Sequence, residues 1–245
     1  MSVDERWFRN IRIVHPSIDD RVDGLAGHLA LAFGAIVGWL VLQIALSTAY
    51  AALFRGGSPV RSVGVAFLMT GATLFVVMAF LWWWLDAQER RTAFPFRSPS
   101  TTEIGWALAF VPLGFATVQL VTAAMAPLGY EFTGPNYDLT DPVIAAGVLV
   151  GPLLLAPIFE EALFRGLLLG SLLDRGLSPT AAALVTIPIF AVPHIWLGVA
   201  GVVGLAAWAI FPTILRLRFN NLTGAALLHF LNNVIAYVVL VAFSF

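Results

Sequence analysis

Cysteine and lysine are both absent from this sequence of 245 residues. The lack of cysteine excludes disulfides, a thiol nucleophile and thiolate metal ligands. All thirteen basic residues are arginine, which is typical of a GC-rich bacterial source. Charged residues of any kind are scarce, at 11% of the chain, and the net charge of −1 provides no basic field for nucleic acid. We therefore expect no nucleic-acid partner.

Hydrophobic residues are abundant instead. They make up 60% of the chain and give a mean hydropathy of +0.90, so a soluble fold could not cover itself with polar surface. The apolar runs are long enough to cross roughly 30 Å of hydrocarbon as helices. The sequence therefore predicts an all-α, polytopic transmembrane helix bundle of about seven spans. These are Leu25–Phe54, Val63–Leu85, Ile104–Leu128, Pro142–Leu173, Pro179–Leu197, Val199–Leu215 and Leu222–Phe243.

The polar segments indicate the domain organisation and the orientation. Residues 1–24 are polar and predict a cytoplasmic arm without a cleavable signal peptide, residues 25–140 contain three spans, and residues 141–245 contain four. With the N-terminus inside, eleven arginines fall in cytoplasmic segments, whereas Arg55 and Arg61 fall outside. This positive-inside asymmetry predicts an integral protein of the bacterial cell membrane whose C-terminus is outside.

Two further patterns concern packing and anchoring. Glycines four residues apart allow helices to approach closely in lipid, and three such pairs occur within the spans. The pairs are Gly34/Gly38, Gly147/Gly151 and Gly166/Gly170. Three consecutive tryptophans, 82–84, close the second span, as expected of an interfacial aromatic belt.

The fourth span contains charged residues at a depth where a charge is costly unless it is paired or hydrated. Glu161 and Arg165 stand at i and i+4, with the carboxylate first, which favours an ion pair on one helix face. Glu160 points about 100° away and has no such local partner. The two carboxylates should therefore differ, with Glu161 tied to Arg165 and Glu160 facing a cavity. Pro157 removes a backbone donor just before them and can bend the helix.

Two other spans bring polar groups to similar depths. His194 follows Pro193 in the fifth span, and His229 and Asn233 share one face of the seventh at i and i+4. Counted from the cytoplasmic ends, Glu160 and His194 lie roughly 20 Å deep, and the seventh-span pair lies roughly 10–17 Å deep. A lone buried histidine or asparagine usually serves only an interhelical hydrogen bond. Agreement in depth across three spans favours one shared site.

The same residues form three motifs in a fixed order. They are Glu160-Glu161-x-x-x-Arg165, Phe190-x-x-x-His194 and His229-x-x-x-Asn233. Together they resemble the motifs of the CPBP family of intramembrane endopeptidases, which includes CAAX proteases, type II CAAX prenyl endopeptidases, Abi-like proteins and bacteriocin-processing enzymes. The resemblance covers about residues 140–245.

The resemblance implies roles for these residues. Glu160 would be the general base that takes a proton from water, and His194 would help to hold that water. His229 and Asn233 would donate hydrogen bonds to the oxyanion of the tetrahedral intermediate. Glu161 and Arg165 would orient the helix or the substrate, and Phe190 would line the cavity. The substrate would be a protein or peptide at the membrane, such as a prenylated C-terminal peptide, a bacteriocin leader or a membrane-anchored regulator.

Other functions are compatible with some of these residues. A zinc protease could instead use Glu160, His194 and His229 as its metal ligands. No His-Glu-x-x-His helix is present, however, and we therefore expect no metal or other cofactor. A proton-coupled transporter could use buried Glu and His groups as a relay, but it would usually show an inverted repeat, and here the polar residues all lie in the second half. A catalytically silent membrane interaction protein is the third alternative. The serines in the spans lack a histidine at helical spacing, which disfavours a serine protease.

Overall fold

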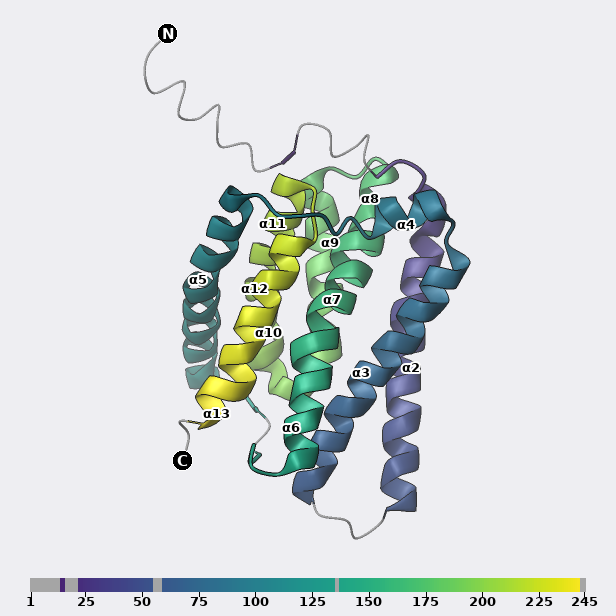
Figure 1. The fold of residues 1–245 in the computed structure, drawn as a ribbon. Coiled ribbons are helices and arrows are strands. Elements are labelled where there is room, and N and C mark those ends of the chain that lie inside the picture. The colour runs from purple at the N-terminus through teal and green to yellow at the C-terminus, as the bar shows by residue number, and fades with distance from the viewer. Residues whose placement is uncertain (1–13, 16–21, 55–58, 135–136, 243–245) are drawn as a thin grey trace, which may run out of the picture.

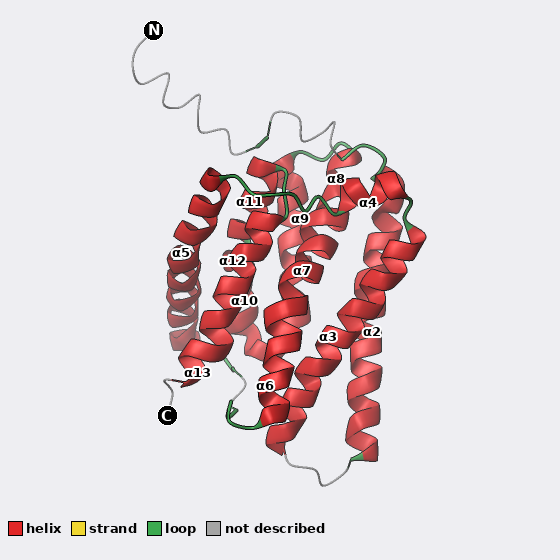
Figure 2. Cartoon of the chain, in the orientation of Figure 1, coloured by secondary structure: helices red, strands yellow, loops and turns green. Residues whose placement is uncertain are grey.

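The structure is a computed structural model that describes residues 14–15, 22–54, 59–134 and 137–242. Most of the predicted polar arm, and Arg55, lie outside these residues. The described chain contains helices and no strand, which confirms the predicted all-α fold (Figure 2). The long helices of the first half are α2 (Leu29–Leu53), α3 (Pro59–Trp84) and α5 (Thr101–Met125), and the short α4 (Ala87–Ala93) connects α3 to α5.

The second half is built from shorter helical pieces joined end to end. The first run consists of α6 (Pro142–Val148), the π-helical η4 (Leu149–Leu155), α7 (Ala156–Glu160), the π-helical η5 (Glu161–Leu168) and α8 (Leu169–Asp174). The second run consists of α9 (Pro179–Ala191), the 3₁₀ segment η6 (Val192–Leu197), α10 (Gly198–Trp208) and α11 (Ile210–Phe219). The last run consists of α12 (Thr223–Val234), the π-helical η7 (Ile235–Val239) and α13 (Leu240–Ala242).

Six helical stretches of the described chain are long and apolar enough to cross a membrane. The longest of them, Pro179–Phe219, has 41 residues and reverses direction at Gly198. Gly198 has φ +75°, which favours glycine, and the carbonyls of Trp196 and Leu197 just before it accept hydrogen bonds from Thr133 in the loop after α5. The described part of the chain thus makes seven passes along the bundle, and the predicted boundary between the fifth and sixth spans falls at this glycine.

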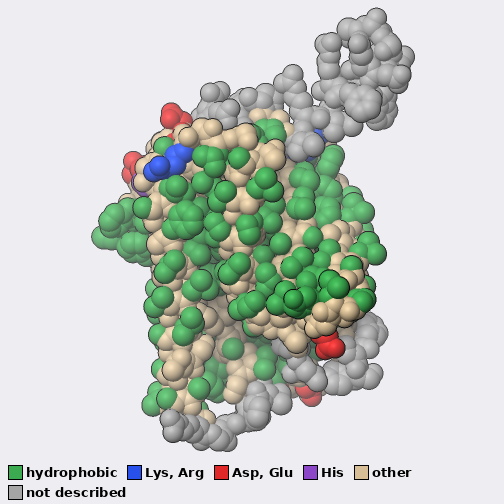
Figure 3. Space-filling view, turned by 180° about the vertical axis from the view of Figure 1, so that it is seen from behind, with side chains coloured by type: hydrophobic (Ala, Val, Ile, Leu, Met, Phe, Trp, Pro, Cys, Tyr) green, Lys and Arg blue, Asp and Glu red, His purple; other side chains and the backbone are tan. Residues whose placement is uncertain are grey.

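Figure 1 shows the passes side by side, with α5 on one flank, α2 and α3 on the other, and α7 and α12 in the middle. Seen from behind, the visible charged side chains lie toward the two ends of the molecule and the surface between them is largely apolar (Figure 3). Such a band is what a hydrocarbon layer requires. The side chains of Trp82, Trp83 and Trp84 are exposed at the end of α3, as an interfacial belt should be. The described chain is therefore a polytopic membrane protein.

Close helix approach depends on two of the three predicted glycine pairs. A Cβ added at Gly147 would lie 2.3 Å from the Gly64 carbonyl oxygen, and one at Gly151 would lie 2.3 Å from the Phe67 carbonyl oxygen, both on α3. Gly166 and Gly170 also contact other segments closely. The prediction is wrong for Gly34 and Gly38, where a Cβ would meet nothing within 4 Å. The spacing of small residues is a property of one helix, whereas the neighbour it faces is set by the whole bundle.

Alanine substitution separates these two kinds of glycine. Gly151→Ala forces a methyl group against a backbone oxygen that cannot rotate away, so we expect a loss of about 1–3 kcal/mol in stability. Gly34→Ala should be neutral or slightly stabilising, because alanine favours the helix and the space is open. Thermal unfolding of both variants in the same detergent measures the difference. Equal melting temperatures for the two variants would contradict the packing described here.

The first half of the chain also caps a helix of the second half. Leu222, at the N-cap of α12, makes no side-chain capping bond, and the carboxylate of Glu103 on α5 takes that place. Glu103 Oε1 accepts from the Gly224 amide at 2.7 Å, and Oε2 accepts from Asn221 Nδ2 at 3.1 Å. A negative charge at a helix N-terminus is favourable. Glu103, which directly precedes the predicted third span, thus fixes the start of α12.

Candidate active site

The two adjacent glutamates lie where the helix geometry changes. Glu160 ends α7 and Glu161 begins the π-helical η5, and both side chains are buried. One turn earlier, in η4, the Ala156 amide donates to the Gly151 carbonyl, five residues back. In that pattern the Pro152 carbonyl would bond to residue 157, which is a proline and has no N–H. The side chain of Asn233 on α12 donates to this carbonyl instead, from Nδ2 at 2.8 Å.

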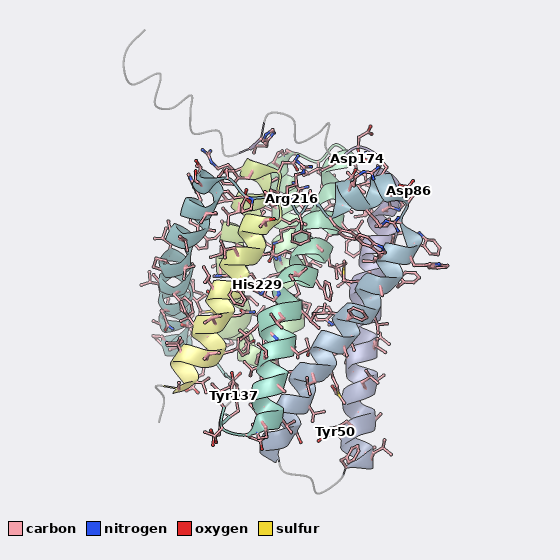
Figure 4. All side chains as sticks on the ribbon, in the orientation of Figure 1. Tyr50, Asp86, Tyr137, Asp174, Arg216 and His229 are labelled. Carbon is pink, nitrogen blue, oxygen red and sulfur yellow. The ribbon has the colours of Figure 1, made fainter. Side chains whose placement is uncertain are left out.

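Glu161 joins two of the predicted residues. Its Oε1 accepts from Arg165 Nη1 at 3.3 Å, so the predicted i, i+4 ion pair is present. The same oxygen lies 2.9 Å from His229 Nδ1. A carboxylate beside an arginine accepts hydrogen bonds, so the proton of the neutral His229 ring sits on Nδ1 and leaves Nε2 as an acceptor. Figure 4 shows His229 at mid-height of the bundle, between Arg216 toward one end and Tyr137 toward the other.

Arg165 is held from several sides although it is completely buried. Its Nη2 donates to the Ala209 carbonyl at 3.4 Å, and its Nε lies 3.5 Å from the Thr213 hydroxyl. Its guanidinium stacks 4.0 Å from the ring centroid of Phe190. Because Arg165 is held by this many partners, it both neutralises the Glu161 carboxylate and fixes the position of that carboxylate. Glu161 therefore presents one oxygen to His229 in a defined place.

His194 faces the other glutamate. It sits in η6 with non-helical dihedrals (φ −92°, ψ 23°), and its Nδ1 lies 3.0 Å from the Phe190 carbonyl. A carbonyl only accepts, so Nδ1 carries the proton and Nε2 of the neutral ring is an acceptor. This Nε2 lies 4.0 Å from Glu160 Oε2, and that oxygen has no hydrogen-bond partner within the described chain. The gap is too long for a direct hydrogen bond and suits one bridging water.

The seven predicted residues therefore form two connected groups. Glu160 and His194 face each other, and Glu161, Arg165 and His229 form a chain of contacts. Phe190 joins the groups, because its ring lies under Arg165, its carbonyl receives His194 and its centroid is 6.2 Å from the His229 ring. Asn233 is one helical turn from His229 and contacts the glutamate-bearing run through Pro152.

Four residues that support the site were missed by the sequence interpretation. Trp208 is fully buried with its ring 5.2 Å from that of His229, and Ala209 and Thr213 hold Arg165. Arg216 was assigned to a cytoplasmic segment, but it is buried within α11 and its Nε donates to the Arg165 carbonyl at 3.1 Å. The spacing of Thr213 and Arg216, at i and i+3, places both on one face of α11 and could have indicated the contact. Nothing in the pattern around Trp208 distinguishes it from an ordinary apolar residue.

The zinc alternative can be compared with this arrangement. Within the described residues, no group of three or more His, Cys, Asp or Glu side chains is placed to hold a metal ion. Glu160 and His194 face each other, whereas His229 contacts Glu161 through Nδ1. The three proposed ligands are therefore not gathered into a His₂Glu cluster among the described residues.

The fold and the buried polar groups define an integral membrane protein with a buried Glu/His cluster. Residues 142–235 match the family model described as "Type II CAAX prenyl endopeptidase Rce1-like". This segment contains all seven motif residues, and the match confirms the resemblance to CAAX-type intramembrane endopeptidases. Neither the curated proteins nor the solved structures include a significant match.

Proposed function

We propose that Glu160 and His194 activate a water molecule that hydrolyses a peptide bond of a membrane-associated protein or peptide. Glu160 takes a proton from the water, and the water oxygen bonds to the carbonyl carbon of the scissile peptide. The tetrahedral intermediate then breaks its C–N bond, and the proton held by Glu160 passes to the leaving nitrogen. The products are a new carboxyl group and a new amine, so atoms and charges balance without a further reactant.

The observation that carries this proposal is that two hydrogen-bond acceptors, Glu160 Oε2 and His194 Nε2, face each other at 4.0 Å. Glu160 Oε2 is buried without a partner in the described chain, and His194 Nε2 is oriented toward it by the bond from Nδ1 to the Phe190 carbonyl. A water between them would donate one hydrogen to each acceptor. Both of its lone pairs would then point away from the two side chains, toward a substrate carbonyl. A carboxylate in such a position is a suitable general base.

The other motif residues support the intermediate in this proposal. Asn233 uses one Nδ2 hydrogen on the Pro152 carbonyl and keeps the second for the developing oxyanion. His229 is oriented by Glu161 and can donate from Nε2 when its ring is doubly protonated. Arg165 stabilises the Glu161 carboxylate and so keeps His229 in place. These contacts make Glu161 and Arg165 positioning residues.

The test is cleavage of a library of membrane peptides by detergent-purified protein, with products identified by mass spectrometry. Wild-type protein is compared with Glu160→Gln and with Glu131→Gln, which alters an exposed loop carboxylate. Cleavage that depends on Glu160 and not on Glu131 supports the proposal. Identical product profiles for wild type and Glu160→Gln would refute it.

We also propose that the N-terminus is cytoplasmic and that α4 lies on the cytoplasmic side. The arginine asymmetry supports this orientation, and the seven passes require the two ends of the described chain to lie on opposite sides. Because the protein has no cysteine, single cysteines can report sidedness without background. We expect Glu131→Cys to react with an impermeant maleimide in intact cells, and Gln88→Cys to react only after permeabilisation. The reverse pattern would invert the topology.

A further inference from the structure

A third polar side chain extends the face of α12 that carries His229 and Asn233. Tyr237 follows His229 at i+8 and Asn233 at i+4, within the π-helical η7. In a continuous α-helix, a residue at i+8 drifts about 80° from the first. A π-helical turn contains more residues than an α-helical one, so η7 reduces this drift and keeps Tyr237 near the same face.

The helix directions bring the tips of Tyr237 and Glu160 toward each other. His229 contacts Glu161 and Asn233 contacts Pro152, so the last run and the α6–α8 run are antiparallel. Side chains on a helix lean toward its N-terminus. Tyr237 therefore leans toward Asn233, and Glu160 leans toward Pro157.

The Tyr237 ring is fixed while its hydroxyl is left available. The ring packs edge-to-face on Phe67, with centroids 5.5 Å apart, and the backbone carbonyl of Tyr237 accepts from the Tyr137 hydroxyl at 2.8 Å. No group in the described chain forms a hydrogen bond with the Tyr237 hydroxyl itself. The phenol is thus a positioned donor without a protein acceptor.

While His229 is neutral, the motif residues offer few donors for an oxyanion. The Nδ1 proton of His229 is directed at Glu161, and a neutral ring has no proton on Nε2. Asn233 has one free hydrogen, because Pro152 takes the other. Oxyanion stabilisation usually relies on more than one directed donor.

We propose that the Tyr237 hydroxyl, together with Asn233, donates a hydrogen bond to the oxyanion of the tetrahedral intermediate. Tyr237 is then a catalytic residue of the Glu160 site, and this inference depends on the peptidase function proposed above. The Tyr237 hydroxyl is neutral and keeps its proton throughout the cycle, because Glu160 carries the proton transfer. The oxyanion returns to a carbonyl when the C–N bond breaks, and the hydrogen bond weakens again.

Two tyrosine-to-phenylalanine variants of the full chain form the test. Tyr237→Phe keeps the ring contact with Phe67 and removes only the hydroxyl, whereas Tyr137→Phe removes a neighbouring hydroxyl that serves backbone packing. We expect Tyr237→Phe to lower kcat about a hundredfold, in the range found for loss of one oxyanion donor, with KM changed less than about threefold. Tyr137→Phe should keep kcat near the wild-type value and lower the melting temperature slightly. The substrate is a peptide cleaved in the library assay, and kcat is normalised to the folded fraction found by gel filtration.

The outcomes separate this inference from the peptidase proposal. If Glu160→Gln is inactive while Tyr237→Phe keeps kcat within about threefold, the oxyanion role is refuted and the peptidase proposal stands. A higher KM with unchanged kcat also refutes it, since that result indicates ground-state binding alone. Equal kcat losses in Tyr237→Phe and Tyr137→Phe would mean that packing, and not the donor, is responsible. If Glu160→Gln cleaves as fast as wild type, the peptidase proposal fails, and the role of Tyr237 fails with it.

Discussion

Glu160→Gln is expected to lower kcat about a hundred- to ten-thousandfold, the range that a general base contributes. Glutamine keeps the shape of the side chain but cannot take a proton from water. The fold should not suffer, because the Glu160 carboxylate is buried without a hydrogen-bond donor in the described chain, and a neutral amide is less costly there. We therefore expect a melting temperature equal to or above that of wild type. Lost stability with retained activity would contradict the assigned role.

The same assay distinguishes the two hydrolytic mechanisms. For the metal-free mechanism that we propose, turnover should survive exhaustive treatment with 1,10-phenanthroline, and elemental analysis should find no stoichiometric zinc. A zinc enzyme would lose activity to the chelator and regain it with added zinc, since metal ligands bind in their deprotonated forms and release the metal to a stronger chelator. Chelator-sensitive, zinc-restored activity would replace the proposed mechanism and leave Glu160 and His194 as site residues.

Arg165→Leu is expected to cause the largest loss of stability, about 3–5 kcal/mol, together with loss of activity. The substitution leaves the Glu161 carboxylate buried beside His229 without its cation, and it removes the bonds to Ala209 and Thr213. Chemical or thermal unfolding in detergent gives the stability, and the peptide assay gives the activity. Arg175→Leu is the control, because Arg175 is exposed and, among the described residues, its side chain donates only to the Ala26 carbonyl.

A double variant separates structure from function in this group. Replacing a buried ion pair by apolar residues is often neutral or stabilising, so Glu161→Leu combined with Arg165→Leu should regain much of the lost stability. Activity should stay low, because His229 then lacks the carboxylate that orients its ring. Restored activity in the double variant would show that Glu161 and Arg165 serve the fold alone.

Much of this protein is determined by local sequence pattern. The apolar runs define the helical passes, since helix rise and bilayer thickness fix the required length. The ion pair of Glu161 with Arg165 and the shared face of His229 and Asn233 follow from helical spacing alone. Even the reversal at Gly198 falls between the two predicted spans, because a positive φ there favours glycine.

Contacts between helices were decided only by the tertiary structure. Whether Gly34 or Gly151 meets a neighbour, whether Glu161 reaches His229, and whether Glu103 caps α12 all depend on the rotation and offset of each helix. The rotation and offset of each helix are set by packing of the whole bundle, and the residue periodicity within one span does not predict them. Burial of Arg216 was missed for the same reason, since its partner is a carbonyl on another helix. Sequence alone thus determined which residues could act, and packing decided which of them meet.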